Sequence, residues 1–283
     1  MFCAAFICFG YSGLWGFRTP MPDRGERIIS ETQVIAQPWS NVELSRLVHL
    51  GANGDVITMD IIWFIQSDGE GTIKYLMRFF GPLEGVSVLR IESPGRPTEV
   101  ILYDPDLGEN RKIKKSELAD YFYHLGWTFE DLTPETGARF DYGKQGIVML
   151  DGLVCNKIQA TPAFPDAENV TRYGSRILWI TQDSGDLRKV EFYDWDGGLI
   201  KTLRASVHES AAEDTPNVVS RPSRMTLEHF EKETLDCSVT LKRKMQVELP
   251  SEIFTEAFIE AWSPEQDVML LSFLEEADES SVE

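Results

Sequence analysis

The amino-acid sequence predicts a mainly β protein, built as a curled antiparallel sheet or barrel with few helices. Apolar and polar residues alternate with the period of a strand in about ten segments along the chain. Turn-forming pairs such as Asp-Gly join successive segments, as they do in β-hairpins. Helical periodicity is confined to about three or four short stretches. Long hairpins at regular spacing, with little helix to cover them, are typical of a curled sheet or barrel.

Residues 176–203 contain the clearest meander. Three extended segments are separated by turn sequences at 183–186 and 194–198. In the middle segment Val190 and Phe192 share one face, while their neighbours in sequence are polar or charged. Because successive side chains of a strand point to opposite faces, this meander has one face for water and one that must pack against apolar groups.

Alternation is equally clear in residues 55–66 and 72–80, which the turn at 67–71 joins. Large apolar side chains occupy one face of this pair, namely Ile57, Met59, Ile61, Trp63, Ile65, Ile73, Tyr75, Met77 and Phe79. Further strands are predicted at 86–92, 98–103, 224–231 and 236–247, and a hairpin over 145–161 turns at Asp151-Gly152.

Helices are predicted where a capping residue precedes an apolar stripe. Residues 116–126 begin at Ser116, which can cap the first turn, and end at Gly126. A C-terminal helix begins at Ser263-Pro264, because proline is favoured in the first turn of a helix. A further short helix is expected within residues 20–37.

The composition indicates a folded protein that does not bind nucleic acid. The chain has 283 residues, of which 42% are hydrophobic and 11% aromatic. Its net charge of −19 repels phosphate, which argues against nucleic acid and against an anionic membrane surface as partners.

The N-terminal residues 1–20 read as a signal segment for export. Met1 to Phe17 carry no charge and are too few for a comfortable membrane span, although the usual preceding basic residues are missing. An apolar first helix is the alternative. Residues 21–262 are then expected to form a single domain, and residues 263–283 a C-terminal helix followed by an acidic tail.

The cysteines are interpreted as free thiols and not as a disulfide. Cys3 and Cys8 lie in the leader, which leaves Cys155 and Cys237 in the mature chain. They are either one disulfide or two buried small apolar residues, and the second interpretation is favoured. The chain has neither a C-x-x-C pair nor the ligand spacing of a metal site.

Catalytic signatures are missing from the sequence. It has no H-E-x-x-H, no G-x-S-x-G elbow and no phosphate-binding glycine loop, so we expect no enzyme activity and no cofactor. The run Asp194-x-Asp196-Gly197 matches only the start of a calcium loop and is better explained as a hairpin turn. Lys201 and Arg243 each interrupt an apolar strand face, which is more typical of paired charges than of catalytic groups.

Five short motifs, in the same order as in one known family, carry a resemblance. They are residues 79–89, residues 100–105 with 111–113, residues 126–132, Tyr193-Asp194 with Gly197 and Lys201-Thr202, and Leu249-Pro250 with Phe254-Thr255. Together they resemble the LolA/LolB-like periplasmic lipoprotein carriers, more closely the uncharacterised branch of outer-membrane lipoprotein-sorting proteins. The resemblance covers about residues 51–261. Trp127 departs from the small residues usual at its position, and the acidic tail lies outside the match.

The resemblance implies a strongly curved, incomplete antiparallel barrel, covered by short helices, whose apolar interior receives acyl chains. The nine apolar side chains at 57–79, together with Val190, Phe192 and Leu203, would line that interior. Trp127, Phe129, Lys201 and Arg243 would surround its mouth, where the two cations could meet a lipid head group. Flexible methionines suit a wall that adapts to a chain ligand. An ordinary filled core is the alternative for the same apolar stripes.

The sequence therefore favours a non-enzymatic, periplasmic carrier or sensor of lipid or lipoprotein acyl chains, acting in outer-membrane lipoprotein sorting. Its expected partners are an acyl chain and a membrane protein that donates or accepts it, and we expect a monomer. The alternative is a structural or interaction module with a filled core that acts through its surface. A lipid hydrolase is a third, less favoured, interpretation.

Overall fold

The computed structural model describes residue 25 and residues 39–93, 96, 98–132, 140–163, 167–209 and 221–275. The expected leader with Cys3 and Cys8, the acidic residues 276–283 and, apart from residue 25, the helix expected within 20–37 lie outside the described residues.

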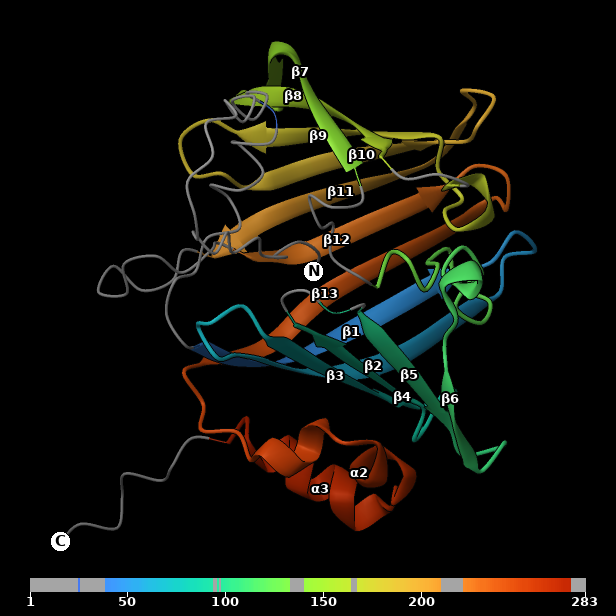
Figure 1. Ribbon diagram of the computed structural model, residues 1–283, viewed down its shortest axis with the longest axis vertical. Coiled ribbons are helices and arrows are strands. Elements are labelled where there is room, and N and C mark those ends of the chain that lie inside the picture. The colour runs from blue at the N-terminus through green and yellow to red at the C-terminus, as the bar shows by residue number, and fades with distance from the viewer. Residues whose placement is uncertain are drawn as a thin grey trace, which may run out of the picture. The chain divides into compact units, whose positions relative to one another are not determined.

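The described chain is mainly β, as predicted (Figure 1). Its strands are β1 (Trp39–Leu50), β2 (Val56–Ser67), β3 (Ile73–Phe80), β4 (Ser87–Glu92), β5 (Glu99–Asp104), β6 (Glu109–Lys112), β7 (Phe140–Leu150), β8 (Leu153–Pro162), β9 (Ser175–Thr181), β10 (Leu187–Tyr193), β11 (Leu199–Glu209), β12 (Arg221–His229) and β13 (Thr234–Met245). They form one sheet in the order β6-β5-β4-β3-β2-β1-β13-β12-β11-β10-β9-β8-β7. Neighbouring strands with a defined register run antiparallel. Since β6 and β7 do not pair with each other, the sheet is not closed into a barrel.

The described helices are short. The α-helices that follow the last strand are α2 (Glu256–Glu260) and α3 (Pro264–Ser272), and single 3-10 turns occur at η1 (Lys115–Glu117), η2 (Ala167–Asn169) and η3 (Ser251–Phe254). Helix α3 begins as predicted, because Ser263 accepts a hydrogen bond from the backbone of Gln266 and Pro264 occupies the first turn. Among the described helices, none has the length and apolar character that a membrane span requires.

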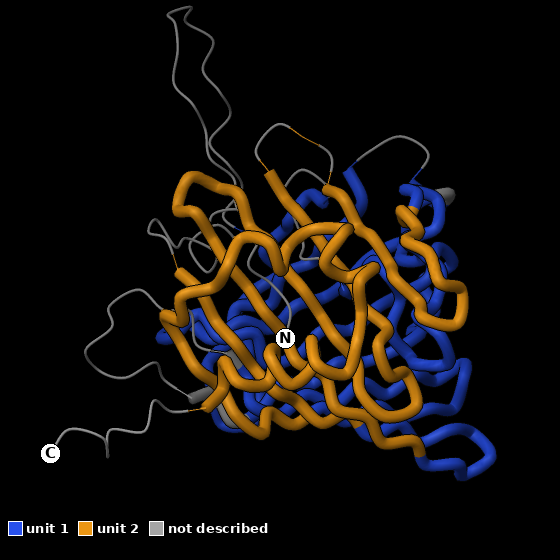
Figure 2. Tube along the Cα trace, turned by 90° about the horizontal axis from the view of Figure 1, so that it is seen from below, with its two compact units in different colours: residues 1–36, 48–56, 114–238 blue, residues 37–47, 57–113, 239–283 orange. Residues whose placement is uncertain are grey.

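The chain divides into two compact units (Figure 2). Unit 1 contains residues 1–36, 48–56 and 114–238, and unit 2 contains residues 37–47, 57–113 and 239–283. The single domain expected over 21–262 stays a prediction.

The predicted hairpins are confirmed. Strands β2 and β3 pair with Trp63 opposite Met77, and β9, β10 and β11 form the meander that opens at Arg176. The β7–β8 hairpin turns at Asp151 and Gly152, with φ angles of 50° and 81°. Positive φ at both turn residues is the geometry for which an Asp-Gly pair is suited.

Strand β1 was not predicted, because most of the residues on its buried face are polar. Asn41, Glu43 and Ser45 are all buried and alternate with Val42 and Leu44 on the opposite face. A strand whose buried positions are polar lacks the alternation of apolar and polar residues that identifies strands in a sequence. Strand β6 and the five-residue helix α2 were also not predicted.

The α-helix predicted over 116–126 is wrong. Only the η1 turn is helical, and the chain then folds back on itself: the backbone N–H of Phe122 donates to Trp127 O at 2.8 Å, and that of Phe129 to Asp120 O at 3.0 Å. Tyr123, at the turn, has a φ of 52°, which an α-helix does not allow. The segment instead buries Phe122 and Leu125 in a fold-back that backbone hydrogen bonds close.

Unit 2 has a core between one face of its strands and the C-terminal helices. Val42, Ile62, Phe64 and Leu76 pack with residues of η3, α2 and α3, including Ile259 and Leu270. A buried ion pair reinforces this packing, because Arg78 of β3 donates to Asp267 of α3 at 3.0 Å. One face of β2 and β3 is thereby covered by helix.

Both cysteines among the described residues are free thiols, as the favoured interpretation predicts. Cys155 is buried and Cys237 half-buried. Burial raises the pKa of the Cys155 thiol, so it is a small apolar side chain rather than a nucleophile at neutral pH.

Candidate functional site

The nine apolar side chains predicted to line the interior at 57–79 all lie in unit 2, on a single face of β2 and β3. The register sets Ile61 opposite Phe79, Trp63 opposite Met77 and Ile65 opposite Tyr75, so these residues share a face. The helix-covered core takes the alternate residues, such as Ile62 and Phe64. The predicted lining face is therefore the one that points away from α2 and α3. We call it the apolar face of unit 2.

This apolar face is closed to solvent along most of its length. Met59, Ile61, Trp63, Ile65, Ile73, Met77 and Phe79 are each less than a tenth exposed, while Ile57 and Tyr75 are half-buried. The face continues onto β4, where Arg90 pairs with Glu92 and lies 4.7 Å from the centre of the Tyr75 ring. Both charges are buried and compensate each other.

The other three predicted lining residues lie in unit 1. Val190 pairs with Leu203 across β10 and β11, and Leu203 pairs with Leu227 across β11 and β12, which makes a continuous apolar strip. Phe192 shares this face but pairs with Lys201. Toward Phe192 the face therefore changes from apolar to charged.

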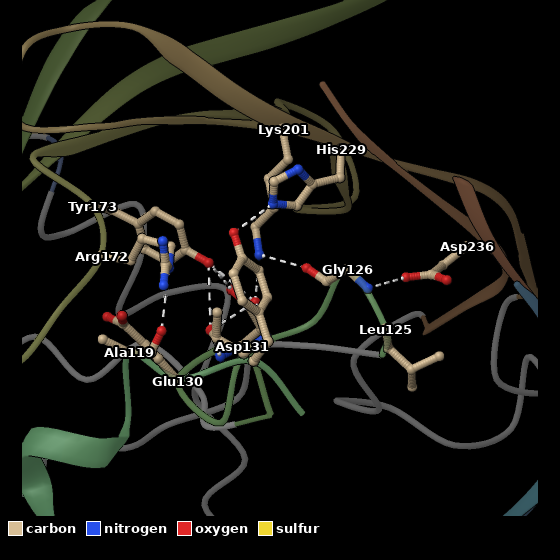
Figure 3. Close-up of polar contacts among 12 residues, drawn as sticks. Ala119, Leu125, Gly126, Glu130, Asp131, Arg172, Tyr173, Lys201, His229 and Asp236 are labelled. Carbon is tan, nitrogen blue, oxygen red and sulfur yellow. Dashed lines mark hydrogen bonds and ion pairs between the residues drawn. The ribbon is translucent and has the colours of Figure 1, made fainter. Parts of the chain in front are cut away.

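The charged end of that face is covered by residues 118–132, which we call the strap (Figure 3). The strap is held together by an antiparallel bridge between Tyr121 and Thr128. Trp127 and Phe129, both predicted to surround a cavity mouth, are buried in it, and Phe129 meets Phe122 edge-on at 5.5 Å. The strap thus combines a hydrophobic interior with polar groups directed at β11 and β12.

Lys201 is the central contact between the strap and the sheet. Its Nζ donates to Asp131 Oδ2 at 2.5 Å and to the carbonyl oxygen of Gly126 at 3.2 Å (Figure 3). The ammonium also lies 5.0 Å from the centre of the Tyr173 ring and 4.9 Å from that of Phe192, within the range of a cation–π contact. Lys201, predicted from sequence as a charge that interrupts an apolar face, is completely buried.

Asp131 receives several further hydrogen bonds. The backbone N–H and the hydroxyl of Thr128 donate to Asp131 Oδ2 at 2.7 and 2.8 Å, and the hydroxyl of Tyr173 donates to Oδ1 at 2.9 Å. Burial alone would raise the pKa of Asp131, but Lys201 and these donors outweigh it and hold the pKa below its ordinary value. Asp131 is therefore an ionised, fully hydrogen-bonded carboxylate.

A second ion pair lies beside the first. Arg176 donates to Glu130 Oε1 at 2.6 Å, and the hydroxyl of Thr171 donates to the same carboxylate at 2.7 and 2.8 Å. The guanidinium of Arg176 lies 4.5 Å from the centre of the Phe140 ring and 4.7 Å from that of Tyr173. Two buried carboxylates thus face two buried cations, which leaves the cluster without net charge.

The strap has a further anchor at Gly126. Its backbone N–H donates to Asp236 Oδ2 at 2.8 Å, and His49 Nδ1 donates to Oδ1 of the same carboxylate at 2.6 Å. A Cβ atom at Gly126 would come within 2.9 Å of Asp236 Oδ2 and 3.3 Å of a Leu227 methyl group, so only glycine fits this close approach.

His229 links β12 to the strap. The Lys232 backbone N–H donates to His229 Nδ1 at 3.2 Å, so Nε2 carries the proton and donates to the Tyr121 hydroxyl at 2.7 Å. Burial, followed by the nearby cations Lys201, Lys232 and Arg172, lowers the pKa of His229 to about 4. The ring is neutral at physiological pH.

The arrangement fixes the strap in place rather than offering reactive groups. Lys201 has no exposed surface. Burial lowers the pKa of its ammonium group, and the attraction of Asp131 offsets part of this effect. Arg243, the other predicted mouth cation, lies in unit 2, where its Nε donates to Glu43 Oε2 at 2.9 Å. Each of the two predicted cations is therefore already paired with a carboxylate. The sequence identified the two cations, but it did not single out the carboxylates that pair with them, Asp131 and Glu43.

Comparison with known proteins identifies a family and a fold. A family model described only as an uncharacterised protein matches residues 71–261. No curated protein matches the chain. Among solved structures, an outer membrane lipoprotein-sorting protein domain from Vibrio parahaemolyticus is similar with a TM-score of 0.75 and 17% sequence identity, over 84% of this chain and 98% of that one.

Two further structures agree with this fold. A DUF1329 family protein from Desulfovibrio piger gives a TM-score of 0.71 at 18% identity, over 83% of this chain and 95% of that one. A LolA superfamily protein from Nitrosomonas europaea gives 0.60 at 16% identity, over 83% of this chain and 98% of that one. The predicted LolA-like fold is confirmed.

Proposed function

Since this chain belongs to the uncharacterised protein family whose model matches residues 71–261, and has a LolA-like fold, we propose that it is a periplasmic carrier or sensor of acyl chains. The acyl chain belongs to a lipid or a lipoprotein and lies along the apolar face of unit 2. The protein acts by binding and release, without catalysis, and exchanges its ligand with a membrane protein.

The observation that carries this proposal is that both faces of β2 and β3 are apolar, while only one of them packs against the C-terminal helices. A helix-packed core uses Ile62, Phe64 and Leu76 on one face. The opposite face carries a second row of large apolar side chains, from Met59 to Phe79, that this core does not use. Since the helix-packed core accounts for only one face of this sheet, we assign the opposite, apolar face to the ligand.

The chemistry of that face suits a hydrocarbon chain. Met59 and Met77 are unbranched and adapt to irregular shapes, while Trp63 and Phe79 provide large contact surfaces. Transfer of each methylene from water to such a surface is worth about 0.8 kcal/mol. At this value about five methylenes supply the roughly 4 kcal/mol of millimolar binding, before the cost of association, and a long acyl chain has more than that.

The fold supports the same conclusion. The solved relative from Vibrio parahaemolyticus is described as an outer membrane lipoprotein-sorting protein domain, and that from Nitrosomonas europaea as a member of the LolA superfamily. Lipoproteins carry acyl chains, and an acyl chain is the kind of ligand that the apolar face of unit 2 could bind.

Extraction of the protein purified from a periplasm tests the proposal. Organic extraction followed by mass spectrometry is expected to release about one lipid or acylated molecule per chain. The delipidated protein should then show a saturable change in tryptophan fluorescence on titration with methyl hexadecanoate, because Trp63 lies on the proposed contact surface.

A clean extract together with unchanged fluorescence would overturn the proposal. That result would favour a module with a filled core that acts through its surface. Turnover of a lipid ester by the purified protein would instead show a hydrolase.

A further inference from the structure

The apolar face of unit 2 carries a small group of buried polar atoms that the described residues do not satisfy. Neither the oxygen nor the nitrogen of the Asn41 amide has a hydrogen-bond partner within the described part of the chain, and Asn41 has no exposed surface. The indole nitrogens of Trp39 and Trp63 are likewise buried without an acceptor among these residues. Burying such a group unpaired costs about 1–3 kcal/mol, so each needs an explanation.

These polar atoms share one face of neighbouring strands. Val42 of β1 and Phe64 of β2 both pack in the helix-covered core, so the odd-numbered residues of both strands point to the other face. Arg46 pairs with Asp60 across β1 and β2 at 2.7 Å. Continued along an uninterrupted ladder, this register places Asn41 opposite Ile65, two residues along β2 from Trp63, so that Asn41 and Trp63 are diagonal neighbours about 7–8 Å apart.

The neighbouring polar residue on this face shows a different pattern. Glu43, two residues from Asn41, accepts hydrogen bonds from Ser45 and Thr240 at 2.8 Å and from Arg243 at 2.9 Å. The fold thus satisfies a buried charge completely at one position and leaves a neutral amide unpaired at the next. Because Asn41 offers a donor and an acceptor side by side, a group with the complementary pair would satisfy both.

We propose that Asn41, with Trp39 and Trp63 beside it, binds the amide linkage of an N-acylated ligand whose hydrocarbon chain lies on the apolar face of unit 2. This inference rests on the proposed function and specifies the class of ligand. The ligand's C=O accepts from Asn41 Nδ2 and an indole N–H, and its N–H donates to Asn41 Oδ1. An ester lacks the N–H, and a carboxylate would bring an unpaired charge into a buried site.

The inference is tested by comparing the affinities of two ligands that differ only in having an amide N–H or an ester oxygen. Delipidated wild-type protein is titrated with N-methylhexadecanamide and with methyl hexadecanoate, which share their chain and shape. We expect the amide to bind about 10-fold more tightly, because the ester leaves Asn41 Oδ1 unpaired. In Asn41→Leu this preference should disappear, while the ester binds within about threefold of its wild-type affinity.

The thermal midpoint of the delipidated protein gives a second readout. Asn41→Leu should raise it by a few degrees, because the variant replaces a buried unpaired amide with an apolar side chain of similar size. The matched control is Asn156→Leu, since Asn156 is also buried in a strand but its Oδ1 accepts from Lys144 at 2.6 Å and Gln182 at 2.9 Å. That variant should lower the midpoint and keep the amide preference.

The outcomes separate this inference from the proposed function. Failure of wild-type protein to bind either ligand overturns both. Equal affinity of wild-type protein for the two ligands, a preference that survives Asn41→Leu, or a lowered midpoint in that variant overturns the amide site and leaves acyl binding intact.

Discussion

Lys201 Nζ lies 2.5 Å from Asp131 Oδ2, and neither side chain has appreciable contact with solvent. The pair joins β11 to the strap across 70 residues of sequence. Glu130 and Arg176 form a second ion pair beside it. Buried charges of this kind contribute little net stability as a set, but removal of one member leaves its partner uncompensated in a medium that solvates charge poorly.

Substitution of Lys201 should therefore be far more damaging than its position in a strand suggests. Lys201→Met leaves the Asp131 carboxylate buried and is expected to lower the free energy of unfolding by about 3–5 kcal/mol. The double variant Lys201→Met/Asp131→Leu should recover part of the loss, because the lone charge is gone. Urea unfolding of the single and double variants measures both changes.

Arg46→Met is the control for this experiment. Arg46 also pairs with a carboxylate, Asp60, but its side chain is half exposed, so its removal should leave the free energy of unfolding nearly unchanged. Equal effects of Lys201→Met and Arg46→Met would contradict the role assigned to the buried pair.

Protonation of His229 should destabilise the protein in acid. The folded-state pKa is lowered to about 4 from an ordinary value of 6.5, so the unfolded chain binds the proton first as the pH falls. The stability contributed by the neutral ring is complete above pH 6.5 and is lost as the pH falls toward 4. We expect a loss of about 1–2 kcal/mol, because the partly exposed Tyr121 and Lys232 side chains let solvent screen the ring.

Urea unfolding between pH 4 and pH 7 checks this slope. His229→Gln keeps a donor and an acceptor but does not titrate, so its stability should change less over the same pH range than that of the wild type. A difference between the two proteins that is constant with pH would exclude His229 as the source. Comparison of the two curves also removes the contribution of carboxylates that both proteins share.

The strands that were predicted correctly can be recognised from the alternation of apolar and polar residues within each strand. In β2 and β3 the register that pairs Trp63 with Met77 follows from alternation within each strand and a short turn between them. The β9–β11 meander was recognisable for the same reason, since Val190 and Phe192 alternate with charged residues. No distant part of the chain was needed to identify these elements.

Strand β1 and the strap depend on contacts that no local pattern shows. Glu43 is buried because Arg243, 200 residues away, neutralises it. Lys201 could be identified as a charge on an apolar face, but its partner Asp131 is one of 46 acidic residues, and the sequence does not distinguish it from the others. The helix prediction for the strap failed because the chain reverses at Tyr123 and forms backbone hydrogen bonds across the reversal, so tertiary context overrides local propensity.

Helix α3 should depend on the buried ion pair that attaches it to β3. Asp267→Leu leaves the Arg78 guanidinium buried, and within the described part of the chain the Gln266 amide oxygen, 2.7 Å away, is then its remaining hydrogen-bond partner. We expect a loss of about 2–4 kcal/mol in unfolding free energy and faster proteolytic cleavage near residue 264. Glu265→Leu, in the same helical turn but exposed, should change neither measurement. Resistance of Asp267→Leu to cleavage would show that apolar packing alone holds the helix.

Replacement of Met77 by tryptophan should block acyl binding while the protein stays folded. Met77 lies opposite Trp63 on the apolar face of unit 2 and is 1% exposed, so the larger ring occupies the surface proposed for the hydrocarbon chain. Overpacking costs about 1–3 kcal/mol, which a domain of this size tolerates. Met77→Trp should weaken the binding of methyl hexadecanoate at least about 10-fold in a fluorescence titration, with unchanged circular dichroism. The same substitution at Met149, which is 65% exposed, introduces an equal number of tryptophans away from the face and should bind normally. Normal binding by both variants would place the ligand elsewhere, because a chain lying across β2 and β3 could not avoid position 77.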